Sequence, residues 1–140
     1  GCHSAAPSLS SDHVSVDRLA AVTTTSVQRE LQANEASARI AIVKIDTEGA
    51  EVSVLESLRS IWPRIDNIVV ETNPFRWPKV SNATVDEAAN LYAALLENPA
   101  NFLGAYTSGG THIESADAMR AYIFGMGRGY WDQQDIWFYA

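Results

Sequence analysis

The chain has 140 residues, of which 46% are hydrophobic, and a formal net charge of −7. This length and this hydrophobic content suffice for one domain with a packed core and exclude general disorder. An acidic chain repels phosphate backbones and anionic lipid, so we expect neither nucleic acid nor a membrane surface as partner.

The first part of the chain contains one weak strand signal and one helix signal. Residues 1–13 are small and polar and are predicted to be a flexible lead-in, with the folded domain spanning 14–140. Residues 14–19 (VSVDRL) alternate apolar and polar, which suits a short strand or a turn entry. A capping-box spacing at Thr25 predicts a modest helix after it. The chain begins with Gly1 rather than methionine, as expected for a fragment or a processed product.

Two apolar strands are predicted in the middle of the chain. Residues 40–45 (IAIVKI) are β-branched and almost continuously apolar, which is typical of a strand covered on both faces in a parallel sheet. A helix is expected to follow and to end before Pro63. Residues 67–70 (NIVV) form the second strand. Because Pro74 disfavours helical backbone at the residue before it, the chain should leave the sheet there.

The last part of the chain continues the alternation of helices and strands. Thr84 and Glu87 have capping-box spacing and predict the start of an amphipathic helix. Strands are expected at 102–106 and 136–139, with a helix at 115–124 between them. This alternation is typical of an α/β sheet.

Two of the predicted strands run directly into acidic residues. Asp46 follows the first strand and Glu71 the second. Ligands of open α/β sheets bind beyond the carboxyl ends of the strands, so parallel neighbours would project both carboxylates into one cleft. Asn73 follows Glu71 closely, and Glu48 and Glu51 lie near Asp46. Glu48 and Glu51 also have a purely structural explanation, because a helix dipole favours acids in the first turn.

Residues 43–51 (VKIDTEGAE) resemble the signature segment of FkbM-like S-adenosylmethionine-dependent methyltransferases. Residues 14–19 and 68–71 (IVVE) resemble the segments that flank this signature in the family. The similarity covers residues 14 to 74, and from there to Ala140 only the element order agrees.

This resemblance implies an α/β, Rossmann-like class I methyltransferase sheet. Residues 40–45 would be its fourth strand and 67–70 its fifth, with 102–106 and 136–139 as the final antiparallel pair. Complete members carry a glycine-rich loop and an acid on earlier strands, and residues 1–39 supply neither. The chain is therefore expected to be the C-terminal half of the domain, strands four to seven, with the N-terminal cofactor-binding strands absent.

One glycine cluster, residues 125–129 (GMGRG), imitates a dinucleotide-binding loop in composition. Such a loop needs a strand before it and a helix after it, and too few residues follow here. The cluster is therefore predicted to be a flexible loop.

The resemblance also implies site roles. S-adenosylmethionine would be the methyl donor, and a hydroxyl of a small molecule or glycan the acceptor. Asp46 is the expected general base and Glu71 the second catalytic carboxylate, with Asp46 and Glu48 at the cofactor. Glu48, Glu51 and Asn73 would contact the substrate. Alternatively, Asp46, Glu71 and Asn73 offer hard oxygen ligands for Mg²⁺, as in catechol-type O-methyltransferases.

Two functions from different classes are compatible with these residues. One is a methyltransferase fragment, inactive alone if the missing loop is essential. The other is a non-catalytic half-domain that binds a partner or serves as an assembly piece. Without a preceding strand, residues 40–45 would present a free sheet edge, so a homodimer or a complementing N-terminal half is the expected partner. The single cysteine, Cys2, cannot form an internal disulfide and favours a reducing, cytoplasmic location.

Overall fold

The computed structural model describes residues 27, 29–30, 38–97, 99–100, 102–127 and 133–140. The predicted lead-in at 1–13, the 14–19 segment and the helix cap at Thr25 lie outside these residues. Among the helices of the described part, none is long and apolar enough to cross a membrane.

The described strands and helices alternate along the chain, which confirms the predicted mixed α/β class. In chain order they are β1 (Val43–Ile45), α2 (Glu51–Ser57), the 3₁₀ helix η1 (Arg59–Arg64), β2 (Asn67–Thr72), α3 (Trp77–Val80), α4 (Val85–Ala94), β3 (Gly104–Thr107), β4 (His112–Ile113), α5 (Ala116–Met126) and β5 (Gln134–Tyr139).

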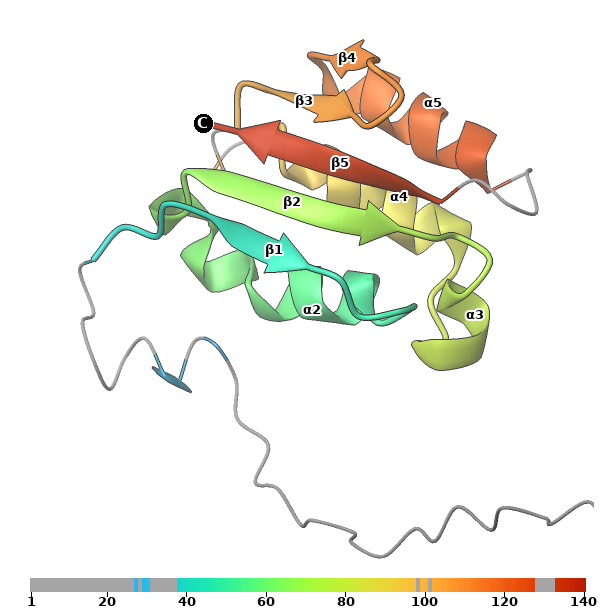
Figure 1. Cartoon of the computed structure of the whole chain (residues 1–140), viewed down its shortest axis with the longest axis horizontal. Helices are drawn as coiled ribbons and strands as arrows, with labels where there is room; N and C mark the ends of the chain where they lie inside the picture. Colours follow the sequence, from blue (N-terminus) through green and yellow to red (C-terminus); the bar gives the residue numbers. More distant parts are fainter. Residues whose placement is uncertain (1–26, 28, 31–37, 98, 101, 128–132) are drawn as a thin grey trace, which may run out of the picture.

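The strands form one sheet in the order β1-β2-β5-β3-β4 (Figure 1). β1 and β2 are parallel, with Ile45 opposite Val70. β5 lies antiparallel between β2 and β3, so the expected antiparallel pairing of the last two predicted strands is observed. The sequence did not predict β4, which forms a hairpin with β3. Gly110 in the connecting turn has a φ of 85°, which glycine adopts without steric cost.

Both strands predicted in the middle of the chain differ in extent from the prediction. β1 begins at Val43, and Ile40 forms only an isolated bridge with Ile65. β2 extends to Thr72, because antiparallel pairing with β5 continues to the end of that strand. Glu71 therefore lies within β2 rather than beyond it.

The helix after β1 is also shorter than predicted. α2 ends at Ser57, and the chain continues as the 3₁₀ helix η1, which contains Pro63. A proline inside an α-helix removes a backbone hydrogen bond and clashes with the preceding turn, so the α-helix does not continue through it.

The capping box predicted at Thr84 and Glu87 is confirmed, and a second cap precedes α5. The hydroxyl of Thr84 accepts a hydrogen bond from the Glu87 backbone N–H at 3.2 Å, and the Glu87 carboxylate accepts one from the Thr84 N–H at 2.8 Å. Ser115 caps α5 by accepting from the Ala118 N–H at 3.2 Å. These bonds satisfy N–H groups that a helix start otherwise leaves without partners.

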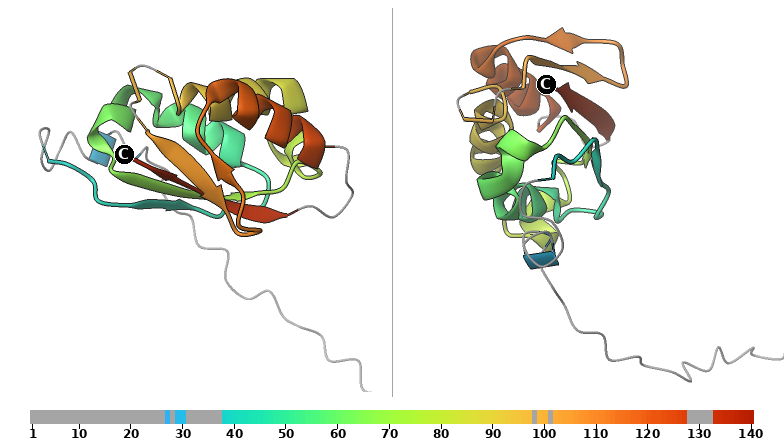
Figure 2. Two further views of the ribbon diagram at one scale, coloured as in Figure 1. Left: turned by 90° about the horizontal axis from the view of Figure 1, so that it is seen from above. Right: turned by 90° about the vertical axis from the view of Figure 1, so that its left-hand side faces the viewer.

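Helices α2, α4 and α5 cover one face of the sheet (Figure 2). The core between the two layers is apolar and contains aromatic rings in contact. Phe138 of β5 lies with its ring centroid 6.0 Å from that of Tyr92 and 6.2 Å from that of Phe102. All three rings are buried.

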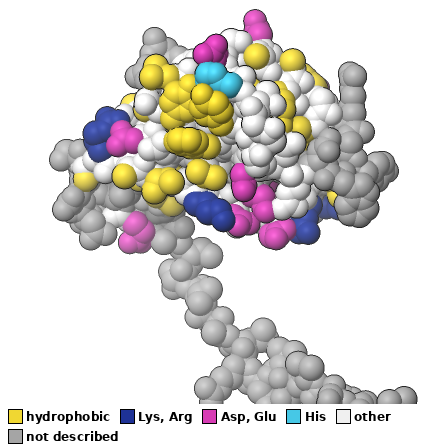
Figure 3. Space-filling model, turned by 45° about the horizontal axis from the view of Figure 1, so that its top comes forward, with side chains coloured by type: hydrophobic (Ala, Val, Ile, Leu, Met, Phe, Trp, Pro, Cys, Tyr) yellow, Lys and Arg dark blue, Asp and Glu magenta, His cyan; other side chains and the backbone are white. Residues whose placement is uncertain are grey.

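The opposite face of the sheet carries a row of residues in cross-strand register: Lys44, Val69, Trp137, Tyr106 and His112. Tyr106 and Trp137 are 42% and 45% exposed, and the Tyr106 ring stacks on that of His112 with centroids 4.3 Å apart. Figure 3 shows hydrophobic side chains gathered beside a histidine at the surface. The sequence predicted a first strand covered on both faces. Within the described residues, helices cover only one face.

The glycine cluster near the end of the chain is not the predicted loop where the structure describes it. Gly125 and Met126 are the last residues of α5, and Gly127 caps it. Met126 is buried in the core, which holds the final turn of the helix against the sheet. Arg128 and Gly129 lie outside the described residues.

Replacing Gly125 by alanine should therefore stabilise the protein by about 0.5–1 kcal/mol, because glycine is a poor residue inside a helix. A Cβ at this position meets no atom within 4 Å. Urea unfolding measures the change. Gly127→Ala is the matched control and should destabilise, since its Cβ would lie 2.8 Å from Val85 Cγ1. A loss of stability with Gly125→Ala would contradict the helical assignment.

Candidate functional site

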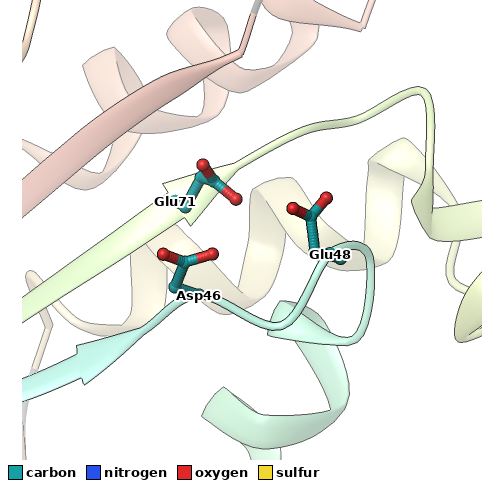
Figure 4. Close-up of side chains that lie close together, drawn as sticks. All are labelled: Asp46, Glu48 and Glu71. Carbon is teal, nitrogen blue, oxygen red and sulfur yellow. The ribbon is translucent and has the colours of Figure 1, made fainter.

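Three carboxylates converge at the carboxyl ends of the parallel strands. Asp46 follows β1, Glu71 lies near the end of β2, and Glu48 lies in the loop after β1 (Figure 4). One carboxylate oxygen from each lies within 4.8 Å of the others. Asp46 and Glu71 adjoin because the preceding residues, Ile45 and Val70, are direct partners in the parallel ladder.

Two basic side chains partly neutralise this acidic cluster. Lys44 Nζ lies 3.0 Å from Asp46 Oδ2, and Arg76 Nη1 lies 2.5 Å from Glu48 Oε2. These pairs are solvent-exposed, so they contribute little to stability, but they orient the two carboxylates.

The loop that carries Glu48 has an uncommon backbone. Glu48 has a φ of 56° and Gly49 a φ of 116°. Gly49 is also packed closely, since a Cβ there would lie 2.8 Å from Val80 Cγ2 and 2.9 Å from Arg76 Cβ. Glycine is therefore required by both the backbone angle and the contact with the α3 region.

The environment separates the pKa values of the two adjoining acids. The hydrogen bond from Lys44, with smaller effects of Glu71 and the Lys44 charge, lowers the pKa of Asp46 below its ordinary value. Burial, and then the neighbouring Asp46, raise the pKa of Glu71, while the Gln133 side chain that donates to Glu71 opposes this rise. Asp46 is thus the more acidic member and Glu71 the better proton acceptor.

The pH dependence of stability should follow these two directions. Glu71 has a raised pKa in the folded state, so its contribution to stability is present below its ordinary value of 4.5 and is lost as pH rises through the folded pKa. The pKa of Asp46 is lowered in the folded state, so the effect on stability has the opposite sign. Its contribution to stability is present above its ordinary value of 3.8 and is lost as pH falls through the lowered folded pKa.

Carboxyl ¹³C NMR titration should resolve both groups, and Asp46→Asn should lower the pKa of Glu71 because it removes a neighbouring negative charge. Lys44→Met is the complementary variant and should raise the pKa of Asp46. A Glu71 pKa that does not respond to Asp46→Asn would contradict this coupling.

The other two predicted substrate-binding residues occupy different places. Glu51, at the first turn of α2, is only 1% exposed and accepts hydrogen bonds from groups within the protein. Asn73 lies just beyond β2, and its Nδ2 donates to Gln133 Oε1 at 3.4 Å. Glu51 therefore faces the interior, whereas Asn73 lies beside the cluster through Gln133.

Sequence reasoning missed Gln133 altogether. Gln133 directly precedes β5, and the antiparallel register sets its neighbour Gln134 opposite Thr72 at the end of β2. No local pattern marks Gln133, because only the pairing of strands more than 60 residues apart brings it to Glu71.

Trp77 and Trp137 occupy different environments. Trp77 is completely buried, with its indole Nε1–H bonded to Glu51 Oε2 at 3.0 Å. Trp137 lies on the open sheet face and donates to Asn67 Oδ1 at 2.9 Å. Trp131 lies outside the described residues.

A groove of about 630 Å³ lies on the helical side between α2 and α4. Ser53, Asn82 and Asn90 are among the residues that line it, and none of the three clustered acids does. The acids are thus an exposed site at the sheet edge, separate from this groove.

The sequence matches the methyltransferase FkbM domain over residues 3–130. The chain belongs to the FkbM methyltransferase family. The resemblance indicated by residues 43–51 is thereby confirmed, and the match extends on both sides of the 14–74 region. Searches of curated proteins and of solved structures gave no significant match.

Enzymes of the FkbM methyltransferase family generally depend on S-adenosylmethionine. The chemistry of the acidic cluster fits this cofactor. Carboxylate oxygens accept hydrogen bonds from ribose hydroxyls, and a net negative site attracts a sulfonium cation. Asp46 and Glu48 are the exposed members of the cluster and are available for these contacts.

Proposed function

We propose that this FkbM-family chain takes part in methyl transfer from S-adenosylmethionine to a hydroxyl of a small molecule or glycan. The observation that carries the proposal is the convergence of Asp46, Glu48 and Glu71 at the carboxyl ends of a parallel strand pair, in a chain that matches a methyltransferase domain. The cofactor supplies an activated methyl group. The residues of the chain bind and align the reactants, which is the main source of acceleration in such a displacement.

The adjoining pair of acids serves the acceptor hydroxyl in this proposal. Glu71, with its raised pKa, takes the hydroxyl proton, and Asp46, kept ionised by Lys44, orients the hydroxyl. The sequence favoured Asp46 as the general base, whereas this proposal gives that role to Glu71. Glu48, held by Arg76, and Asn73, beside Gln133, are the substrate contacts.

The sheet order supports an assignment within the class I methyltransferase fold. β1 and β2 would be strands four and five, and the antiparallel β5 between β2 and β3 would be strand seven beside strand six.

Calorimetry with S-adenosylmethionine tests the proposal first, and binding in the micromolar range is expected because Asp46 and Glu48 are exposed and available to the cofactor. Transfer of a labelled methyl group to a panel of sugars and small alcohols then tests the reaction. Asp46→Asn and Glu71→Gln should each lower the rate by roughly 10²–10⁴. Asp86→Asn, an exposed acid in the first turn of α4, is the control and should leave the rate unchanged. Full activity of both site variants would refute the assigned roles.

Magnesium is a second candidate for the acidic cluster, because the three carboxylates are hard oxygen ligands close enough to share one ion. The sequence predicted Asp46, Glu71 and Asn73 as the magnesium ligands. In the structure Glu48 takes the place of Asn73 in the cluster. Titration of the chain with Mg²⁺, followed by the carboxyl NMR signals of Asp46 and Glu71, tests it. Shifts that saturate would support a bound ion, and unchanged signals would exclude one.

A non-catalytic role in assembly with another chain is the alternative function. Within the described sheet β1 pairs only with β2, and Ile42 just before it is 61% exposed. A free strand edge beside an exposed apolar side chain favours pairing with another chain. A homodimer or a complementing N-terminal half would cover this edge. Sedimentation at high concentration tests it, and a uniform monomer would argue against the homodimer.

A further inference from the structure

The buried Glu51 is the least expected member of the signature segment. It begins α2, is 1% exposed, and is the one charged residue among the buried polar side chains of the described chain. A carboxylate loses its hydration on burial and needs several donors in exchange. The donors of Glu51 come from two separate parts of the chain.

One oxygen of Glu51 holds the site loop. Oε1 accepts from the Gly49 N–H at 2.8 Å, from the Thr47 hydroxyl at 3.1 Å and from the Thr47 N–H at 3.3 Å. These donor residues flank Glu48, whose φ is 56°, and Thr47 directly follows Asp46. The carboxylate therefore lies inside the curve of the loop and fixes its uncommon backbone.

The other oxygen attaches that loop to the core. Oε2 accepts from the indole Nε1–H of Trp77 at 3.0 Å, and Trp77 is completely buried at the start of α3. α3 directly follows Arg76, which pairs with Glu48. One side chain thus links the loop backbone with the segment that holds the Glu48 carboxylate.

We infer that Glu51 is a positioning residue, which sets the loop that presents Asp46 and Glu48. This inference rests on the proposed function only in that the positioned acids bind S-adenosylmethionine. Glu51 itself is too deeply buried to touch cofactor or substrate. Its effect is transmitted through the backbone of Thr47 and Gly49 and through Trp77.

A glutamine at this position separates positioning from packing. Glu51→Gln keeps the shape but replaces one acceptor oxygen by an NH₂ donor, and the N–H groups of Thr47, Gly49 and Trp77 that face it can only donate. Either the loop or Trp77 then loses its partner, and loss of the negative charge weakens the hydrogen bonds that remain on the other side. Met119→Ala, a core truncation in α5, is the control for general destabilisation because Met119 is fully buried elsewhere in the fold.

The test uses the full chain with ¹⁵N NMR and calorimetry. For Glu51→Gln we expect the Gly49 amide to exchange at least tenfold faster, the Trp77 indole N–H signal to move, and affinity for S-adenosylmethionine to fall at least tenfold. Amides of β5 should keep their exchange rates. Met119→Ala should lower the melting temperature without a selective effect on Gly49.

Three results would overturn the inference: unchanged Gly49 exchange in Glu51→Gln, the same Gly49 response in Met119→Ala, or altered exchange with unaltered cofactor affinity. A wild-type chain that binds no S-adenosylmethionine would refute the proposed function instead. In that case a selective Gly49 response in Glu51→Gln would still support the ordering of the loop by Glu51.

Discussion

Phe138→Ala is expected to lower the free energy of unfolding by about 3–5 kcal/mol, the range for removing a large buried aromatic ring. Phe138 lies on β5, between the two halves of the sheet, and its ring contacts those of Tyr92 and Phe102. The truncation leaves a cavity that neighbouring rings cannot fill without leaving their own positions. Urea unfolding followed by fluorescence measures the change.

The adjacent residue on the same strand provides the control. Trp137 points to the open sheet face, is 45% exposed, and donates one hydrogen bond to Asn67. Trp137→Ala should therefore cost only about 1 kcal/mol. A larger loss for Trp137→Ala than for Phe138→Ala would mean that the helices cover the other face, and the assignment of the core would be wrong.

Gly49→Ala should be the most damaging single-methyl addition at the site. The backbone angle of 116° costs about 1–3 kcal/mol for a residue with a Cβ. Overpacking against Val80 and Arg76 adds about 1–3 kcal/mol. Because Arg76 holds Glu48, the displaced loop should also lose affinity for the methyl donor. Unfolding measurements and calorimetry on the same sample test both effects.

Gly110→Ala separates the cost of the backbone angle from the cost of overpacking. Gly110 has a φ of 85°, but a Cβ there meets no atom within 4 Å, so only the backbone cost of about 1–2 kcal/mol applies. Gly110 lies in the β3–β4 turn, which contributes no residue to the acidic cluster, and its variant should keep the cofactor affinity of the wild type. Equal losses of stability in the two variants would show that packing against Val80 contributes nothing.

The features that local sequence could predict concern neighbours along the chain. A capping box needs only Thr84 and Glu87, and a strand that runs into an acid needs only the order of Ile45 and Asp46. The signature at 43–51 is contiguous as well, and it identified the family that the domain match confirms. Such patterns depend on hydrogen bonds and spacings within a few residues, so they can be recognised without knowledge of the fold.

The extents of the elements depended on more distant partners. β2 is longer than its apolar run because β5 pairs with it to Thr72. α2 is shorter than its apolar spacing suggests, with Pro63 enclosed in a 3₁₀ helix. The glycines at the end of α5 are helical because Met126 is buried there, although composition alone favoured a loop. In each case packing or pairing outweighed a local preference.

By itself, then, the sequence determined the α/β class, the family and the position of Asp46 directly after its strand. The tertiary structure alone decided that Glu51 is an internal ligand of the site loop, that Gln133 reaches Glu71, and that Trp77 is buried while Trp137 is exposed. The physical reason is the same for all three. Burial and hydrogen bonding of a side chain depend on which distant segments pack beside it, and no local spacing records that.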